Sequence, residues 1–323
     1  MNHQQIVFLV FAIIVTILFA IDLRSLFRNP DKEVSNKHAM LWTFTWIFFA
    51  MMFSIYIYIE DGLEKFSQFQ SAYWIEQSLS VDNLFVFLMV FKYFKTTGLA
   101  QHKILVWGII GAIIFRAIFI FSGTWLIELT DLPPFWYFGA PGPYDPINII
   151  ILCFGIMLLY GGIKTFFSKI VEETSDFNNS IGAKLVRKVF KVVDISDEKR
   201  FWTRRNGKLF ATKLLLVLVV VETTDLVFAV DSIPAIFSIA PKDPLILYTS
   251  NIFAIFGLRS MYFLLANSMD KFEKLQYGIA FILVFIGIKM IISPMIPINT
   301  MISLTFILVT LLVSILFSLR STK

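Results

Sequence analysis

Five acidic residues stand inside long apolar stretches of this 323-residue chain, and their spacing repeats. In each of two segments an acid precedes the aspartate of a Val-Asp pair by six residues, and a small amide or hydroxyl residue follows the pair. A charged side chain inside a bilayer costs about 2.5–3.5 kcal/mol to insert, so each acid needs a basic partner, a proton, water or a bound cation. The candidate metal ligands are Glu76, Asp82 and Asn83 in the first segment and Glu222, Asp225, Asp231 and Ser232 in the second.

The donor atoms of these side chains select the class of ion. Carboxylate, amide and hydroxyl oxygens suit Mn²⁺, Mg²⁺ or Ca²⁺ better than zinc or copper. The single cysteine, Cys153, lies in an apolar run, and the three histidines form no cluster that would supply softer ligands. We therefore expect a hard divalent cation as the transported ligand, and no prosthetic group.

Two arginines inside apolar stretches, Arg116 and Arg259, are the candidate counter-ions, with a gating role as the alternative. Two cations do not neutralise five carboxylates. Crowding and loss of water both favour the protonated form of the remaining acids, so the cluster could exchange protons for a divalent cation. We hypothesise a carrier that works by alternating access and couples cation release to proton entry.

The spacing within the second segment predicts an irregular helix. Glu222 and Asp225 are three residues apart and share a helix face, but a straight helix would turn Asp231 away from them by about a third of a turn. Pro234 follows closely and removes a backbone donor. We therefore predict a break or kink near 230–234 that turns Asp231 toward the other two acids and frees backbone carbonyls as ligands. A matching break in the first segment is inferred only from the repeat.

The elements that must position these acids are long apolar helices. Hydrophobic residues make up 57% of the chain and charged residues 16%, against roughly a quarter in soluble domains. Mean hydropathy is +0.76, and runs of about 20 apolar residues can span a bilayer. The net charge is +5, and the basic residues lie in short loops between apolar runs, which argues against a nucleic-acid partner. We predict an all-α polytopic membrane protein with about nine transmembrane helices, at 6–23, 39–59, 69–90, 103–123, 147–168, 208–238, 246–268, 275–294 and 299–319.

Three markers recur in the same order in spans 3–5 and spans 6–8: the acidic motif, a single arginine, and a Gly-Ile-Lys tripeptide. Alternation of the spans makes the two triplets inverted repeats, which is typical of secondary transporters with a site near the midplane. Spans 1, 2 and 9 are predicted to be peripheral, and span 1 lacks the basic start of a signal peptide. The predicted units are 1–68, 69–168 (first repeat), 169–207 (basic loop), 208–294 (second repeat) and 295–323.

Lysine and arginine concentrate in alternate loops, whereas the loops between them carry only Lys65 and Lys242. The positive-inside rule then places the N-terminus outside and the C-terminus in the cytoplasm. The long loop 169–207 would be cytoplasmic. Residues 180–193 could form a basic amphipathic helix on the inner leaflet, but retention of the loop by its positive charge is the interpretation we favour. The outer loop 124–146, rich in Pro, Gly and aromatic residues, predicts an aromatic belt.

The stretch from Val221 to Phe237, VETTDLVFAVDSIPAIF, resembles the signature of the TerC family of bacterial integral membrane proteins, and Glu76–Asn83 resembles the family's earlier motif. The resemblance covers about residues 40–295 and is closest to the Alx branch. It implies a manganese exporter of the bacterial inner membrane with a link to alkaline conditions, and Glu76, Asp82, Glu222, Asp225 and Asp231 as its transport site. The family's name comes from tellurite resistance, which is a weaker possibility.

Other classes of function fit less well. An aspartyl intramembrane protease would show a Gly-x-Gly-Asp context, which this sequence lacks, so we do not expect an enzyme. An assembly or insertion factor, or a stress-resistance protein without ion transport, would leave the buried acids unexplained. A channel is a further alternative, but inverted repeats favour a carrier. No protein partner is indicated beyond the bilayer, the divalent ion and protons.

Overall fold

A computed structural model describes residues 3–27, 36–130, 148–167, 177–193, 200–205, 208–266, 275–296 and 298–321. The side chains of Asp82, Asp231 and Ser232 lie outside this description, although the helices that carry them do not. The elements are α1 (His3–Phe27), α2 (Asn36–Tyr93), α3 (Gly98–Leu129), α4 (Ile149–Phe167), the 3₁₀ turn η2 (Phe177–Asn179), α5 (Ile181–Val189), β1 (Val192–Val193), β2 (Trp202–Arg205), β3 (Lys208–Thr212), α6 (Lys213–Phe237), α7 (Pro244–Ala266), α8 (Leu275–Ile292) and α9 (Thr300–Ser321).

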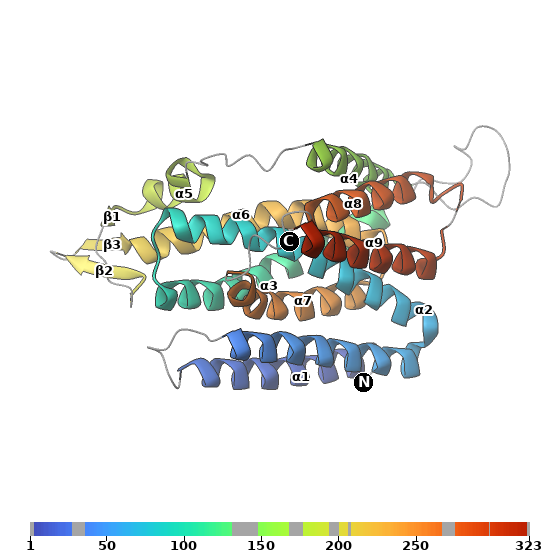
Figure 1. Cartoon of the computed structure of the whole chain (residues 1–323), viewed down its shortest axis with the longest axis horizontal. Helices are drawn as coiled ribbons and strands as arrows, with labels where there is room; N and C mark the ends of the chain where they lie inside the picture. Colours follow the sequence, from blue (N-terminus) through green and yellow to red (C-terminus); the bar gives the residue numbers. More distant parts are fainter. Residues whose placement is uncertain are drawn as a thin grey trace.

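Long apolar helices dominate the described part of the chain (Figure 1). Among the described residues, five helical stretches are long and apolar enough to cross a membrane: Asn36–Ser80, Gly98–Leu129, Ile149–Phe167, Pro244–Ala266 and Thr300–Ser318. Shorter apolar stretches occupy 6–22 in α1 and 277–292 in α8. The prediction of a helical, polytopic chain is therefore confirmed, while the count of nine spans and the inverted repeat stay predictions.

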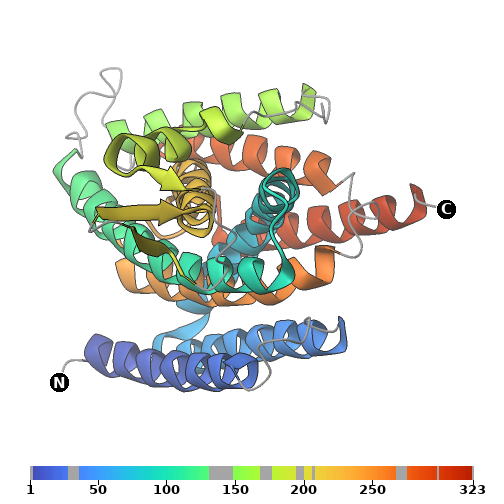
Figure 2. The same ribbon diagram turned by 90° about the vertical axis from the view of Figure 1, so that its left-hand side faces the viewer.

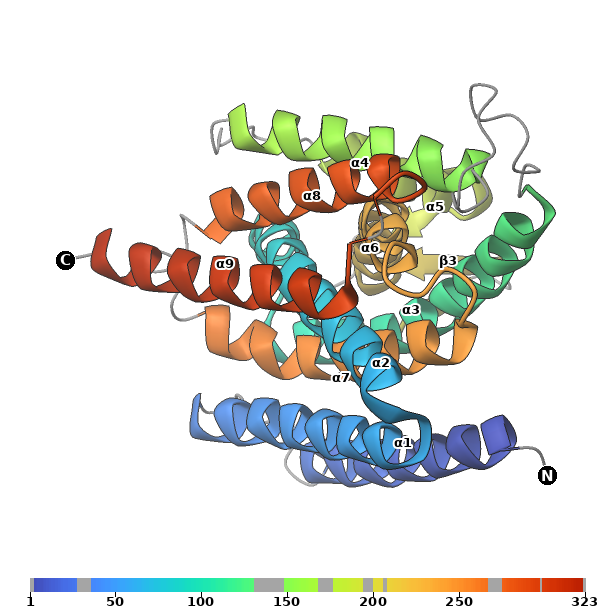
Figure 3. The same ribbon diagram turned by 90° about the vertical axis from the view of Figure 1, so that its right-hand side faces the viewer.

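A single element, α2, contains both the second and the third predicted span. At Gly62 the backbone adopts φ 82° and ψ −174°, a left-handed conformation that glycine tolerates better than other residues. The helix turns there, and its two halves run in different directions (Figure 3). Just after the turn, Lys65 forms an ion pair with Asp243. Gly62 thus separates the N-terminal helices from the half of α2 that carries Glu76.

The second half of α2 lies at the centre of the bundle and packs against α6, α7 and α9, while α3 packs against α6 and α7. On one side of this core, α4 and α8 lie against each other (Figures 2 and 3). Their backbones come close at Gly155, Gly162 and Gly287, since a Cβ atom on Gly287 would lie 2.8 Å from the carbonyl oxygen of Gly155. On the opposite side, α1 and the first half of α2 cover α7 (Figure 2).

The loop between α4 and α6 is more structured than the sequence suggested. α5 falls within the segment 180–193, where an amphipathic helix was considered, but a three-stranded sheet follows it in the order β1-β3-β2. β3 pairs with β1 in parallel and with β2 antiparallel, and it leads directly into α6. The all-α class therefore needs this small correction. α5 and the strands lie together at one end of the molecule (Figure 1).

Of the two predicted irregularities near 230–234, a break or a kink, the break does not occur. α6 stays helical from Lys213 to Phe237 with Pro234 inside it, and α2 is helical across its own acidic motif. A proline within a membrane helix is tolerated when neighbouring helices and local adjustments satisfy the freed backbone groups. Pro234 is buried among such neighbours, so packing compensates for the donor it lacks.

Candidate functional site

Glu76 lies at the centre of a buried hydrogen-bond network built from three helices. Its carboxylate forms an ion pair with Arg116 of α3, and it accepts hydrogen bonds from the Ser80 hydroxyl at 3.2 Å and the Asn251 amide at 3.1 Å. The Asn251 carbonyl in turn accepts a hydrogen bond of 2.7 Å from Arg116. Glu76 is fully buried and Arg116 is 1% exposed. Such a network satisfies a charge that would otherwise be costly in this setting.

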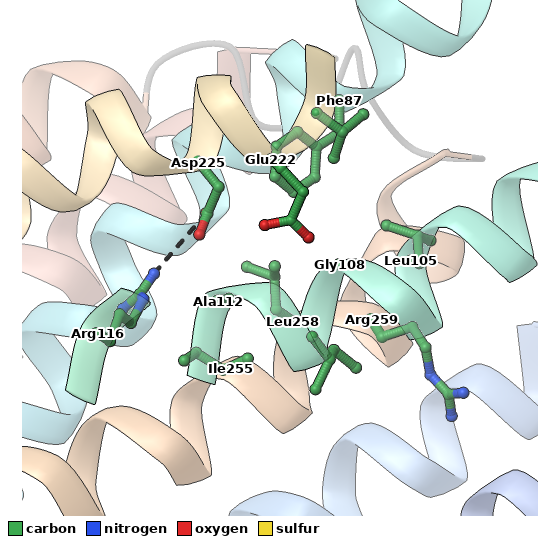
Figure 4. A pocket seen from close by; sticks show the side chains of 12 residues that line it. Phe87, Leu105, Gly108, Ala112, Arg116, Glu222, Asp225, Ile255, Leu258 and Arg259 are labelled. Carbon is green, nitrogen blue, oxygen red and sulfur yellow. Dashed lines mark ion pairs between the residues drawn. The ribbon is translucent and has the colours of Figure 1, made fainter. Parts of the chain in front are cut away.

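Asp225 of α6 approaches the same arginine from the other side. Its Oδ1 atom lies 3.8 Å from Nη2 of Arg116 (Figure 4). The Asn83 side chain forms a hydrogen bond with the Asp225 carboxylate. Arg116 therefore bridges the two acids that the predicted repeat places in corresponding positions, Glu76 and Asp225. The structure brings four predicted residues together here: Glu76, Asn83, Arg116 and Asp225.

Glu222 faces α3 one turn before Asp225, beside a small pocket lined by α2, α3, α6 and α7 (Figure 4). Two glycines of α3 make room for it. A Cβ atom on Gly108 would lie 3.3 Å from the Glu222 Oε1 atom, and one on Gly111 would overlap the carboxylate. Within the described part of the chain, Oε1 is buried and has no hydrogen-bond partner. Among the predicted ligands whose side chains are described, Glu222 is therefore the one whose charge is least compensated.

Arg259 differs from Arg116 in its partner. Its guanidinium forms an ion pair with Asp22 of α1 instead of with the acidic cluster, although Arg259 lines the same pocket as Glu222. Asp22 and Arg259 are 1% and 3% exposed. Sequence reasoning missed Asp22 because it ends an apolar run, where a charge usually reaches water. It also missed Asn251, although a lone amide in the apolar stretch of α7 was a usable signal.

The remaining predicted ligands, Asp82, Asp231 and Ser232, have side chains outside the described residues. Among the residues that are described, no three His, Cys, Asp or Glu side chains are arranged to hold a metal ion. Glu76 and Asp225 are engaged by Arg116, and Glu222 lies one turn before Asp225 on the same side of α6 (Figure 4). A complete cation site would therefore also need Asp82 or Asp231, which follow Glu76 and Asp225 by six residues on the same helices.

A bundle of apolar helices that encloses paired and unpaired carboxylates is the architecture of a multi-pass integral membrane protein. The sequence matches the profile described as "Integral membrane protein TerC family" over residues 61–323, and the chain belongs to this family. The matched region begins at the turn of α2, so α1 and the first half of α2 precede it.

Several curated relatives cover most of the chain. Alx of Escherichia coli K12, provisionally described as a membrane-bound redox modulator, is 41% identical over 290 residues, which is 87% of this chain and 84% of the relative. The protein of the same description from Photorhabdus laumondii is 36% identical over the same length. A Rickettsia felis protein described only as a membrane protein is 36% identical over 311 residues, 96% of each chain. No solved structure matches.

Proposed function

We propose that the chain is a secondary transporter that exports a divalent cation, with Mn²⁺ as the first candidate, in exchange for protons. The transported ion would bind among the carboxylates between α2 and α6, with Glu222, Asp225, Asp82 and Asp231 as the main ligands and Asn83 and Ser232 as neutral oxygen donors. Arg116 would hold Glu76 and Asp225 in place. The chain would lie in the bacterial inner membrane.

The observation that supports this proposal best is that, among the described side chains, the carboxylates of α2 and α6 outnumber the arginines that pair with them. Arg116 lies between Glu76 and Asp225, and Arg259 is occupied by Asp22. Glu222 has a buried oxygen without a hydrogen-bond partner in the described part of the chain. Buried charges that persist in membrane helices usually mark an ion or proton pathway. A hard divalent cation would compensate the surplus.

The identity of the ion and its direction rest on weaker support. Oxygen donors fit Mn²⁺, Mg²⁺ and Ca²⁺ alike. The preference for Mn²⁺ and for export comes from the resemblance of the two acidic motifs to those of manganese exporters in the TerC family.

The description of the relatives as redox modulators names a second candidate function. The chain has one cysteine, Cys153, so an intramolecular thiol pair is not available to it. A redox role would therefore have to act through the cation or through a partner protein.

Cellular manganese provides the direct test. In cells that rely on this protein, Asp231→Ala and Glu222→Gln should raise intracellular manganese under manganese load and reduce growth, because each removes a ligand. Glu64→Gln, a change at an exposed acid near the turn of α2, is the matched control. Elemental analysis of washed cells measures the outcome. Unchanged manganese and unchanged tolerance in both site variants would contradict the export function.

Proton coupling is tested separately in proteoliposomes. An imposed proton gradient should drive Mn²⁺ movement in the opposite direction, and a protonophore should abolish the gradient-driven part. Flux of the same rate at every gradient would remove the antiport mechanism while leaving transport itself intact.

A further inference from the structure

The ion pair between Asp22 and Arg259 connects a segment outside the family match to the edge of the candidate site. Asp22 belongs to α1, whereas the match begins at residue 61. Both side chains are almost completely buried. In the sequence repeat, Arg259 corresponds to Arg116, the arginine that serves the site acids. The repeat therefore leads us to expect Arg259 beside the site acids. In the structure it forms an ion pair with Asp22 instead.

Arg259 and Glu222 line the same pocket from opposite sides, Arg259 from α7 and Glu222 from α6. Figure 4 shows the Arg259 side chain directed away from the Glu222 carboxylate. Each of the two has one buried atom without a hydrogen-bond partner among the described residues, Nη1 of Arg259 and Oε1 of Glu222. Glu222 and Asp225 are the two acids that line the pocket. Asp225 already lies 3.8 Å from Arg116, so Glu222 is the alternative anion that the pocket leaves for the Arg259 guanidinium.

We propose that Asp22 is a positioning residue that holds Arg259 away from Glu222 and so keeps Glu222 available to the transported cation. Without Asp22, the buried guanidinium turns into the pocket and pairs with Glu222, where it competes with the metal ion as an internal cation. Competition between Arg259 and the metal ion rests on the proposed transport function. The exchange of Asp22 for Glu222 as the partner of Arg259 does not. α1, predicted to be peripheral, then sets the charge of the site.

A purely structural role for the pair, in which it only fastens α1 to α7, makes a different prediction. Removal of one partner from a buried ion pair leaves an uncompensated charge and is strongly destabilising. If Arg259 can turn to Glu222, Asp22→Asn will instead be tolerated, and its effect will depend on Glu222. Two residues that share no contact normally contribute additively to stability, so coupling between Asp22 and Glu222 would report the exchange.

A double-mutant cycle on the purified full-length protein tests this. Asp22→Asn should fold with a modest loss of melting temperature, and Glu222→Gln alone should change it little. The double variant should melt about 3–5 °C below the additive value, because Arg259 then has neither partner. When Arg259→Gln is added to each variant, the extra loss of melting temperature in the double variant should disappear. Additive effects in the presence of Arg259, or a failure of Asp22→Asn alone to fold, would overturn the proposal.

Mn²⁺ flux in proteoliposomes tests the competition. Asp22→Asn should raise the KM for Mn²⁺ on the order of tenfold with little change in maximal rate, and Asp22→Asn/Arg259→Gln should restore it. Asp22→Glu, which keeps the carboxylate, should behave like the parent protein. An unchanged KM in Asp22→Asn, or a raised KM that persists in the double variant, would overturn the competitor role. If the parent protein carries no Mn²⁺ at all, the transport function fails, and the stability cycle still decides the exchange.

Discussion

Arg116 sets the charge balance of the site at the scale of single residues. One guanidinium contacts Glu76 and lies near Asp225, and it also donates to the carbonyl of Asn251. A planar group with five N–H donors can serve acids on two helices at once, which the single ammonium of a lysine would do less well. Glu222 remains outside this arrangement, so its charge is not compensated by Arg116.

Gly111 offers a test of how closely Glu222 must approach α3. Gly111→Ala should reduce Mn²⁺ transport about tenfold or more, because the added methyl group would lie where the carboxylate now is. The matched control is Gly161→Ala, since a Cβ atom there would have nothing within 4 Å. Flux in proteoliposomes, compared at equal amounts of folded protein, measures the effect. Equal flux in the two variants would show that the position of Glu222 is not limiting.

Single residues that carry charge in apolar stretches were the most predictable part of the site. Glu76, Arg116, Glu222 and Asp225 were found from the sequence because a charge at that depth is costly to insert and is rarely kept without a function. Which charged residues pair with one another was harder to predict from the sequence. Arg259 was assigned to the acids by symmetry, but its partner lies 237 residues earlier, at the end of an apolar run where nothing distinguishes Asp22 from an interfacial residue.

At the scale of elements, hydropathy located the helices well and their irregularities poorly. The interruption between the predicted spans 39–59 and 69–90 was expected, and the structure places it at Gly62, whose backbone leaves the helical conformation. Pro234 gave a strong signal for a break that packing around α6 overrides. The strands β1, β2 and β3 are two to five residues long, too short for an alternating pattern to stand out in a charged loop.

The crossing of α4 and α8 depends on small residues, as is common between membrane helices. Gly287→Ala should destabilise the protein, since its Cβ atom would lie 2.7 Å from the amide nitrogen of Leu159 and 2.8 Å from the carbonyl oxygen of Gly155. Backbone atoms cannot yield as a flexible side chain can, so we expect a loss of about 1–3 kcal/mol. Thermal melting in detergent measures it, with Gly161→Ala as the control. Identical melting of the two variants would show that the helices can separate without cost.

At the scale of the whole molecule, the two ends of the bundle differ in charge. The end with α5 and the strands carries the exposed Lys184, Lys188 and Arg204, whereas Lys65 and Asp243 pair beside the turn of α2. From the positive-inside rule we expect the first end to face the cytoplasm.

Labelling of single cysteines tests this orientation. In a Cys153→Ser background, Lys242→Cys should react with a membrane-impermeant maleimide in intact cells, and Lys188→Cys should react only after lysis. The background change is needed because Cys153 is exposed. The reverse labelling pattern would show that the topology is opposite to the predicted one, and the proposed direction of transport would then be reversed as well.

The distance along the chain between Asp22 and Arg259 has a consequence for biosynthesis. Translation at about 5–20 residues per second separates the appearance of the two residues by roughly 12–47 s, given the 237 positions between them. During that interval α1 already has its acid but not the arginine that compensates it. Asp22 must then wait near the membrane surface or in its neutral form, and α1 can take its final depth only after α7 has been inserted. α1 is therefore made before α7 but is fixed in place only after it.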